Sequence, residues 1–98
     1  MDAKQLINRR IILGAHGIAH VVVWEVPKPV PASLHGFKYR LAYVVRDVCV
    51  LRYDNEAGKG DHKHIGESEH PYVFSDIDRL VDDFLADIER WNNENSYF

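Results

Sequence analysis

The C-terminal third of the chain carries an apolar residue every three or four positions, which is the period of an amphipathic helix. The residues that recur are Ile77, Leu80, Val81, Phe84, Leu85, Ile88 and Trp91. Ser75 followed by Asp78 resembles a capping box, and acids in a first turn suit the positive end of a helix. The pattern therefore predicts one long helix that ends near Trp91 or Asn93 and packs across a sheet.

Upstream of this helix, polar and apolar residues alternate with the period of two that is typical of β-strands. The alternation is cleanest over residues 37–45. Further strands are expected over residues 10–14, 18–26 and 48–54, with a short edge strand over 71–74. Arg46-Asp47 would form the tip of a tight hairpin, and residues 1–10 are expected to form a short turn or helix.

These elements predict an α+β fold in a single domain, residues 1–98. Four to five antiparallel strands in a meander need cover on their apolar face, and the long C-terminal amphipathic helix can supply it. The length of 98 residues agrees with one domain.

Residues 53–64, between the predicted sheet and the helix, combine turn formers, charges and imidazoles. Gly58 and Gly60 permit backbone angles that other residues avoid, and they let the main chain approach a ligand closely. Asp61-His62-Lys63-His64 follows at once. If this run is extended, His62 and His64 share one face and Asp61 and Lys63 share the other.

Composition limits the class of protein. The chain is 46% hydrophobic and 28% charged, and it has no apolar run long enough to span a membrane. Met1-Asp2-Ala3-Lys4 lacks the basic and apolar regions of a secretion signal, and the single Cys49 has no disulfide partner within the chain. We therefore expect a cytoplasmic protein without membrane contact.

The formal net charge of −3 is unevenly distributed along the chain. Residues 1–35 and 36–64 each carry a balance of +2, whereas residues 65–98 carry −7. This asymmetry is compatible with a basic sheet that meets phosphate and an acidic helix that is turned away from it or toward a basic partner. It is equally compatible with acids that only solvate one face of the helix.

Four short runs of the sequence also carry a family resemblance. They are His-Gly-Phe-Lys-Tyr-Arg at 35–40, Tyr-Asp-Asn-Glu at 53–56, Gly-Lys-Gly-Asp-His-Lys-His at 58–64 and Pro-Tyr-Val-Phe at 71–74. Together they resemble the TumE family of toxins from bacterial type II toxin–antitoxin systems, over residues 25–90. The resemblance implies a toxin that inhibits growth and is neutralised by a cognate DNA-binding antitoxin encoded beside it. It carries over no catalytic residues.

Residue chemistry favours RNA cleavage without a metal ion as the mechanism. Attack of a ribose 2′-hydroxyl on the adjacent phosphate needs a base, an acid and cations for the developing charge. His62 and His64 are the candidate base and acid, with Asp61 to orient an imidazole and Lys63 to steady the phosphate. The candidate substrate-binding residues are Lys38, Arg40, Arg52, Lys59, Gly58 and Gly60.

Other interpretations stay open. Histidines in a polar loop are often only solvated, and Asp61, His62 and His64 could instead bind zinc or manganese with Glu67, His70 or Asp54. No second ligand cluster has metal-site spacing, so we predict neither a metal nor another cofactor. A non-catalytic binding module, or a toxin that blocks a target protein by binding, is the alternative function, and a homodimer is a further candidate assembly.

Overall fold

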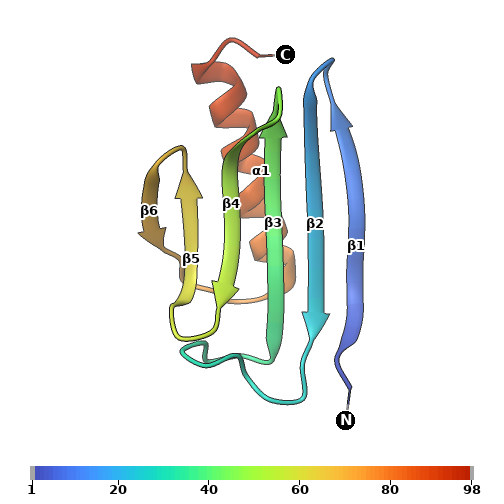
Figure 1. Ribbon diagram of the computed structural model, residues 1–98, viewed down its shortest axis with the longest axis vertical. Helices are drawn as coiled ribbons and strands as arrows, with labels where there is room; N and C mark the ends of the chain where they lie inside the picture. Colours follow the sequence, from blue (N-terminus) through green and yellow to red (C-terminus); the bar gives the residue numbers. More distant parts are fainter. Residues whose placement is uncertain (1, 98) are drawn as a thin grey trace.

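The computed structural model describes residues 2–97 of the chain. Each strand turns back beside the one before it, so that six antiparallel strands form a meander in chain order (Figure 1). The elements are β1 Lys4–Leu13, β2 Gly17–Glu25, β3 Phe37–Val45, β4 Val48–Glu56, β5 Gly60–Ile65, β6 Ser68–Pro71 and α1 Ile77–Glu94. The predicted α+β meander with a C-terminal helix is confirmed, but it has six strands rather than four to five.

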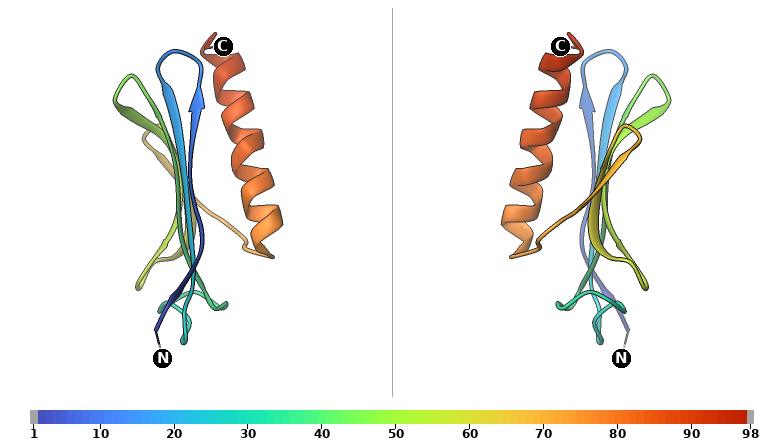
Figure 2. Two further views of the ribbon diagram at one scale, coloured as in Figure 1. Left: turned by 90° about the vertical axis from the view of Figure 1, so that its right-hand side faces the viewer. Right: turned by 90° about the vertical axis from the view of Figure 1, so that its left-hand side faces the viewer.

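Helix α1 lies against one face of the sheet, and no other described element covers the opposite face (Figure 2). The fold is therefore a two-layer structure with an open sheet face. Residues that alternate along each strand point to the helix or to this open face. Within residues 2–97, no helix combines the length and apolar composition needed to cross a membrane.

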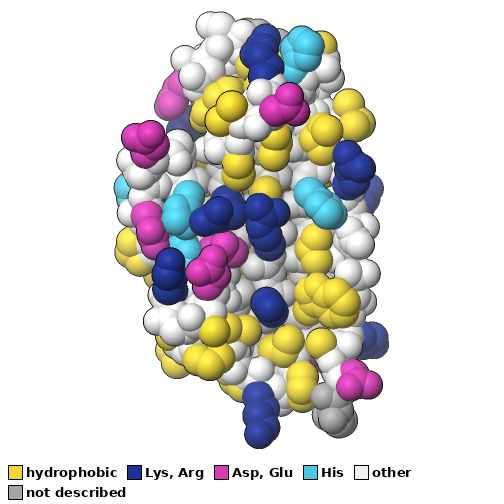
Figure 3. Space-filling model, viewed as in Figure 1, with side chains coloured by type: hydrophobic (Ala, Val, Ile, Leu, Met, Phe, Trp, Pro, Cys, Tyr) yellow, Lys and Arg dark blue, Asp and Glu magenta, His cyan; other side chains and the backbone are white. Residues whose placement is uncertain are grey.

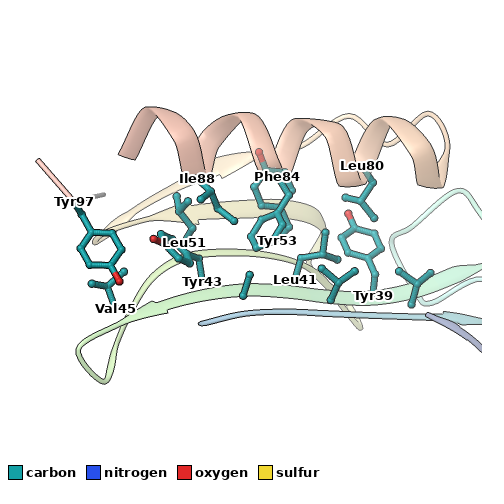
Figure 4. Close-up of a cluster of buried hydrophobic side chains, with 13 residues drawn as sticks. Tyr39, Leu41, Tyr43, Val45, Leu51, Tyr53, Leu80, Phe84, Ile88 and Tyr97 are labelled. Atoms are coloured by element: carbon teal, nitrogen blue, oxygen red, sulfur yellow. The ribbon is translucent and has the colours of Figure 1, made fainter. Parts of the chain in front are cut away.

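The core lies between α1 and the central strands. Tyr39, Leu41 and Tyr43 of β3 point toward the helix, where they are buried beneath its apolar stripe (Figure 4). Phe84 meets Tyr53 of β4 edge to face, with ring centroids 5.6 Å apart. Burial of such aromatic side chains is a main source of stability in a domain of this size.

The N-terminal segment corrects the prediction of a short turn or helix over residues 1–10. Met1 lies outside the described residues, and β1 begins at Lys4 and pairs with β2 along its whole length. A register shift between Gln5 and Ile7 leaves Leu6 as an extra residue, which interrupts the period-two alternation. The predicted strand over residues 10–14 is the C-terminal part of β1, and its N-terminal part was missed because the bulge interrupts the alternation by which strands are recognised.

The segment before the helix also differs from the prediction. The edge strand is Ser68–Pro71 and not residues 71–74, because Gly66, at a φ of +59°, allows a tight turn directly after β5. Pro71 then ends the strand, since it has no amide to donate. The N-cap of α1 is Asp76 and not Ser75: its carboxylate accepts a hydrogen bond from the Arg79 amide at 2.7 Å.

The central hairpin and the end of the helix agree closely with the sequence patterns. Strand β3 has the predicted bounds, and Arg46 and Asp47 form the hairpin tip with positive φ angles of 49° and 65°. Two positive φ angles give a type I′ turn, whose twist matches that of paired strands. Helix α1 ends at Glu94, one residue beyond the predicted range.

Phe84→Ala should lower the free energy of unfolding by about 3–5 kcal/mol, because it removes a fully buried ring at the centre of the helix–sheet interface. Urea unfolding followed by circular dichroism measures this loss. Leu85→Ala is the matched control, since the neighbouring side chain is 42% exposed. An equal loss in both variants would contradict the packing described for α1.

Candidate functional site

The open face of the sheet carries two neighbouring rows of mostly polar side chains that run across the strands. Strand register places Arg10, His20, Ala42, Arg52, His64 and Glu69 in one row. The adjacent row holds Asn8, Val22, Arg40, Asp54, His62 and Pro71. Figure 3 shows cationic, acidic and imidazole side chains gathered in a band across the middle of this face.

His62 lies in strand β5 with both ring nitrogens close to acceptor groups. Its Nδ1 is 3.0 Å from the carbonyl oxygen of Gly60, and its Nε2 is 2.8 Å from Asp54 Oδ1. A carbonyl only accepts, so Nδ1 carries a proton and Nε2 is the nitrogen that faces the carboxylate. His62 and Asp54 are 4% and 6% exposed, which makes them a buried imidazole–carboxylate pair.

The approach of His62 to Asp54 is close but poorly aligned. Asp54 Oδ1 is buried without a well-formed hydrogen bond, and so is the Nε of Arg52, which lies 3.1 Å from Asp54 Oδ2. Buried polar atoms are normally paired, and exceptions gather at functional sites. The Asp54 carboxylate therefore lies close to His62 and Arg52, but Oδ1 of Asp54 and Nε of Arg52 form no well-aligned hydrogen bond.

His64 has a different neighbour and a different protonation pattern. Nη2 of Arg52 lies 3.0 Å from His64 Nε2, and because a guanidinium only donates, this nitrogen is an acceptor without a proton. The His62 and His64 rings are 4.9 Å apart and nearly perpendicular. The site therefore holds one imidazole nitrogen that can take a proton and another that can share a proton with a carboxylate.

Asp61 and Lys63 lie on the helix side of the sheet, separated by the backbone from His62 and His64. Asp61 accepts hydrogen bonds from Ser33 Oγ at 2.6 Å and Tyr39 Oη at 2.7 Å. Nε2 of His35 is a third partner, at 2.6 Å. Asp61 thus orients the imidazole of His35, not that of His62 or His64.

This network around Asp61 fastens the connector between β2 and β3 to strand β5. Burial alone would raise the pKa of Asp61, but the hydrogen bonds from Ser33, His35 and Tyr39 outweigh it and hold this pKa below its usual value. Burial, and then the hydrogen bond to Asp61, raises the pKa of Tyr39. Asp61 is therefore ionised at neutral pH and holds the connector in place.

Lys63 on β5 forms an ion pair with Asp87 on α1 and so holds the helix against the sheet. Its Nζ is 3.1 Å from Asp87 Oδ2, and the hydroxyl of Tyr53 donates to the same carboxylate. Asp87 is buried, so Lys63 supplies the opposite charge that its burial requires.

Of the four predicted catalytic residues, the structure brings together only His62 and His64.

The predicted substrate-binding residues also lie in different parts of the structure. Arg52 stands on the open face beside His64. Arg40 is on the same face with Asp54 between it and His62, and Lys38 is nearer the end of the sheet. Lys59 lies 3.7 Å from Glu56 in the β4–β5 turn.

The two glycines of this turn have structural roles. The Gly58 amide donates to the Pro31 carbonyl at 2.9 Å, so it is not available to a ligand. A Cβ at Gly60 would lie 3.1 Å from the Ala32 carbonyl oxygen, and its φ is +75°. Gly60 therefore lets the turn pack closely against the β2–β3 connector, whereas Gly58 supplies a φ of +84° in open space.

The sequence patterns do not predict that Asp54 contacts His62 and Arg52; they indicate it only as an additional metal ligand. Its signal was symmetry about the β4–β5 turn: Arg52 and Asp54 stand two apart before it, and His62 and His64 stand two apart after it. The register pairs Asp54 with His62 and Arg52 with His64. Equal spacing on both sides of a hairpin turn places such residues face to face.

Asp54, His62 and His64 are also the residues that could hold a metal ion. One ligand atom from each lies within 4.8 Å of the others, and two imidazoles with a carboxylate suit zinc. The Arg52 guanidinium beside them opposes a second cation through its own positive charge. A metal ion at this place would share the Asp54 carboxylate with Arg52.

Comparison with known proteins returned one result. The family model described as toxin TumE matches residues 3–92 of the chain. No curated protein and no solved structure matches.

Asp61→Asn should lower the free energy of unfolding at neutral pH by about 1–3 kcal/mol, because three donors lose their charged acceptor. Since the pKa of Asp61 is lower in the folded state, its contribution is present above the unfolded pKa and disappears as pH falls through the folded one. Urea midpoints measured from neutral to acid pH should therefore converge for the two proteins. Asp82→Asn, an exposed helix acid, should run parallel to the native protein. A constant offset for Asp61→Asn at all pH values would contradict this account.

Proposed function

The chain belongs to the TumE family of toxins, and we propose that it is an endoribonuclease that cleaves RNA without a metal ion at the open face of its sheet. The observation that carries the proposal is the paired imidazoles of His62 and His64, whose rings lie 4.9 Å apart with different hydrogen-bond partners. A reaction that needs a base and an acid at once is served by two imidazoles in opposite protonation states.

His64 acts as the base in this proposal. Its Nε2 is free of a proton, and it removes the proton of the ribose 2′-hydroxyl as that oxygen bonds to the adjacent phosphorus. Arg52, which donates to His64 in the structure, transfers its hydrogen bonds to the phosphate oxygens when RNA binds. A guanidinium suits this exchange because its donors match both an imidazole nitrogen and a phosphate.

His62 acts as the acid. A proton on its Nε2 passes to the 5′-oxygen of the leaving nucleotide as the bond from phosphorus to that oxygen breaks. The residue lines a hollow of about 350 Å³ together with Lys59, Glu69 and His70, which gives the leaving group a path to the ring. Asp54 is the positioning residue: before RNA binds, its carboxylate lies against His62 Nε2 and also holds Arg52. When RNA binds, the leaving oxygen replaces Asp54 as the acceptor of the Nε2 proton.

Arg40 and Arg52 supply positive charge for the phosphate in the transition state. Both extend from the open face, in neighbouring rows on adjacent strands. Stabilisation of developing charge by prearranged cations is a large contribution to catalysis of this kind.

The family implies an antitoxin partner in general, and we propose that this antitoxin binds DNA, as in type II systems. The outer face of α1 carries exposed acids at Asp78, Asp82 and Glu89. A basic segment of the antitoxin would complement these charges. This contact leaves the opposite face of the sheet free for RNA.

Induced expression of the native chain should arrest growth with decay of total RNA, and the His62→Ala/His64→Ala variant should do neither. Loss of the acid and the base should slow cleavage by the purified protein about 10²–10⁴-fold for each group. His16→Ala, at the exposed β1–β2 turn, is the matched control and should retain full activity. Circular dichroism verifies that each variant folds. Arrest with intact RNA would instead indicate a toxin that blocks a target protein by binding.

A chelator should leave the rate of RNA cleavage by the purified protein unchanged, because the proposed acid and base need no ion. The measurement is cleavage of a labelled RNA after dialysis against EDTA, with and without added zinc. Loss of activity on dialysis and its return with zinc would move the chemistry to a metal held by Asp54, His62 and His64.

A further inference from the structure

We infer that the open face holds a second nucleotide subsite, on β1, β2 and β3, so that the toxin binds single-stranded RNA along a track across the sheet. The inference rests on the proposed function, since it extends the substrate away from His62 and His64. It assigns a role to Arg10 and His20, which take no part in the chemistry described above.

The subsite is a hollow of about 310 Å³ on the open face. It is lined by Arg10, Ile18, His20, Arg40, Ala42 and Val44. Apolar side chains therefore form its floor, while two guanidinium groups and an imidazole stand around it. This combination suits a nucleotide, whose base is flat and largely apolar on its faces and whose phosphate is negatively charged.

The hollow exists because a small residue occupies the middle of the row. Ala42 is 3% exposed and stands between His20 on β2 and Arg52 on β4, both of which have much longer side chains. The His20 ring is held at the rim, with its Nε2 2.9 Å from Asn8 Oδ1. A ring fixed at the edge of an apolar hollow can stack on a base that enters it.

The subsite is continuous with the proposed catalytic pair. Ala42 lies beside Arg52 in the register, and Arg52 contacts His64, so one row of side chains connects the two places. Neighbouring strands are about 4.8 Å apart, which puts Arg10 on the order of 19 Å from His64 along this row. A short extended strand of RNA can cover both places across the sheet.

Charge on the part of the track formed by β1, β2 and β3 favours phosphate. Among the described residues of β1, β2 and β3, the register places no Asp or Glu on the open face, where Arg10, Lys38 and Arg40 all lie. Helix α1, which carries many of the acidic residues of the chain, lies on the other side of the sheet (Figure 2). Cations on one face, opposite an acidic helix, orient a polyanion toward the open face.

The ligand is a single strand because the subsite uses the face of a base. In a duplex the base faces are stacked on one another, so an apolar floor and an imidazole have nothing to contact. In an unpaired strand each base can leave the stack and lie on a side chain, while the backbone follows the cations. The shallow hollow on the open face fits this second mode.

Arg10→Gln is the first test variant, and Arg9→Gln is its matched control. The two residues are neighbours on β1, both are exposed and both changes remove one positive charge, but Arg9 points to the helix side. The probe is a labelled 2′-O-methyl single strand, which lacks the attacking hydroxyl, with binding followed by fluorescence anisotropy at several salt concentrations. Arg10→Gln should bind the probe several-fold more weakly. The slope of the logarithm of its binding constant against the logarithm of salt concentration should be smaller in magnitude by about 0.7, whereas Arg9→Gln should match the native protein in both.

Ala42→Leu tests the hollow separately from the charge. The larger side chain fills the subsite from its floor and leaves the net charge unchanged. Affinity should fall about fivefold or more, the loss expected when one base no longer stacks, with the salt slope unchanged.

The outcomes separate this inference from the proposed function. If Arg10→Gln and Ala42→Leu both bind like Arg9→Gln, or if a 2′-O-methyl duplex binds as tightly as the single strand, the track is wrong, whatever the His62→Ala/His64→Ala variant shows. If the variants weaken binding as expected but the native protein cleaves no RNA, the track stands and the proposed reaction is wrong.

Discussion

A single helix can cover only one face of a six-stranded sheet, and this limit decides how the strands distribute their side chains. Helix α1 supplies the apolar cover, so the aromatic and aliphatic residues of β3 and β4 point toward it. The other face has no layer of its own among the described residues, and it carries the arginines and imidazoles. The candidate site is thus a consequence of building a two-layer fold with one helix.

The β4–β5 hairpin connects the two faces. Its alternation sends Asp54, His62 and His64 to the open side and Tyr53 and Lys63 to the helix side. A slip of one residue in this register would exchange the two sets, burying Arg52 in the core and exposing Tyr53. The hairpin that anchors the helix through Lys63 and Asp87 is therefore the same one that aligns the imidazoles. The contacts that stabilise the fold and the residues of the proposed reaction therefore both depend on the register of β4 and β5.

Two carboxylates close to this hairpin have opposite roles because their surroundings differ. Asp61 has three well-formed hydrogen bonds and fastens a connector, whereas Asp54 has close charged neighbours and a buried oxygen without an aligned donor. In the sequence Asp61 stood beside the histidines and was the more obvious candidate partner. The alternation of an extended strand places Asp61 on the face opposite His62 and His64, and the structure gives its partners there as Ser33, His35 and Tyr39.

The sequence by itself determined the amphipathic helix, the cleanly alternating β3 strand, the α+β meander and the shared face of His62 and His64, because each depends on a local period. Only the tertiary structure decided which residues of different elements meet. The bulge at Leu6 concealed the first half of β1. The partners of Asp54, Asp61 and Lys63 come from strand register, from the β2–β3 connector and from a helix many residues away. Such contacts depend on how elements pair and pack, which no local period records.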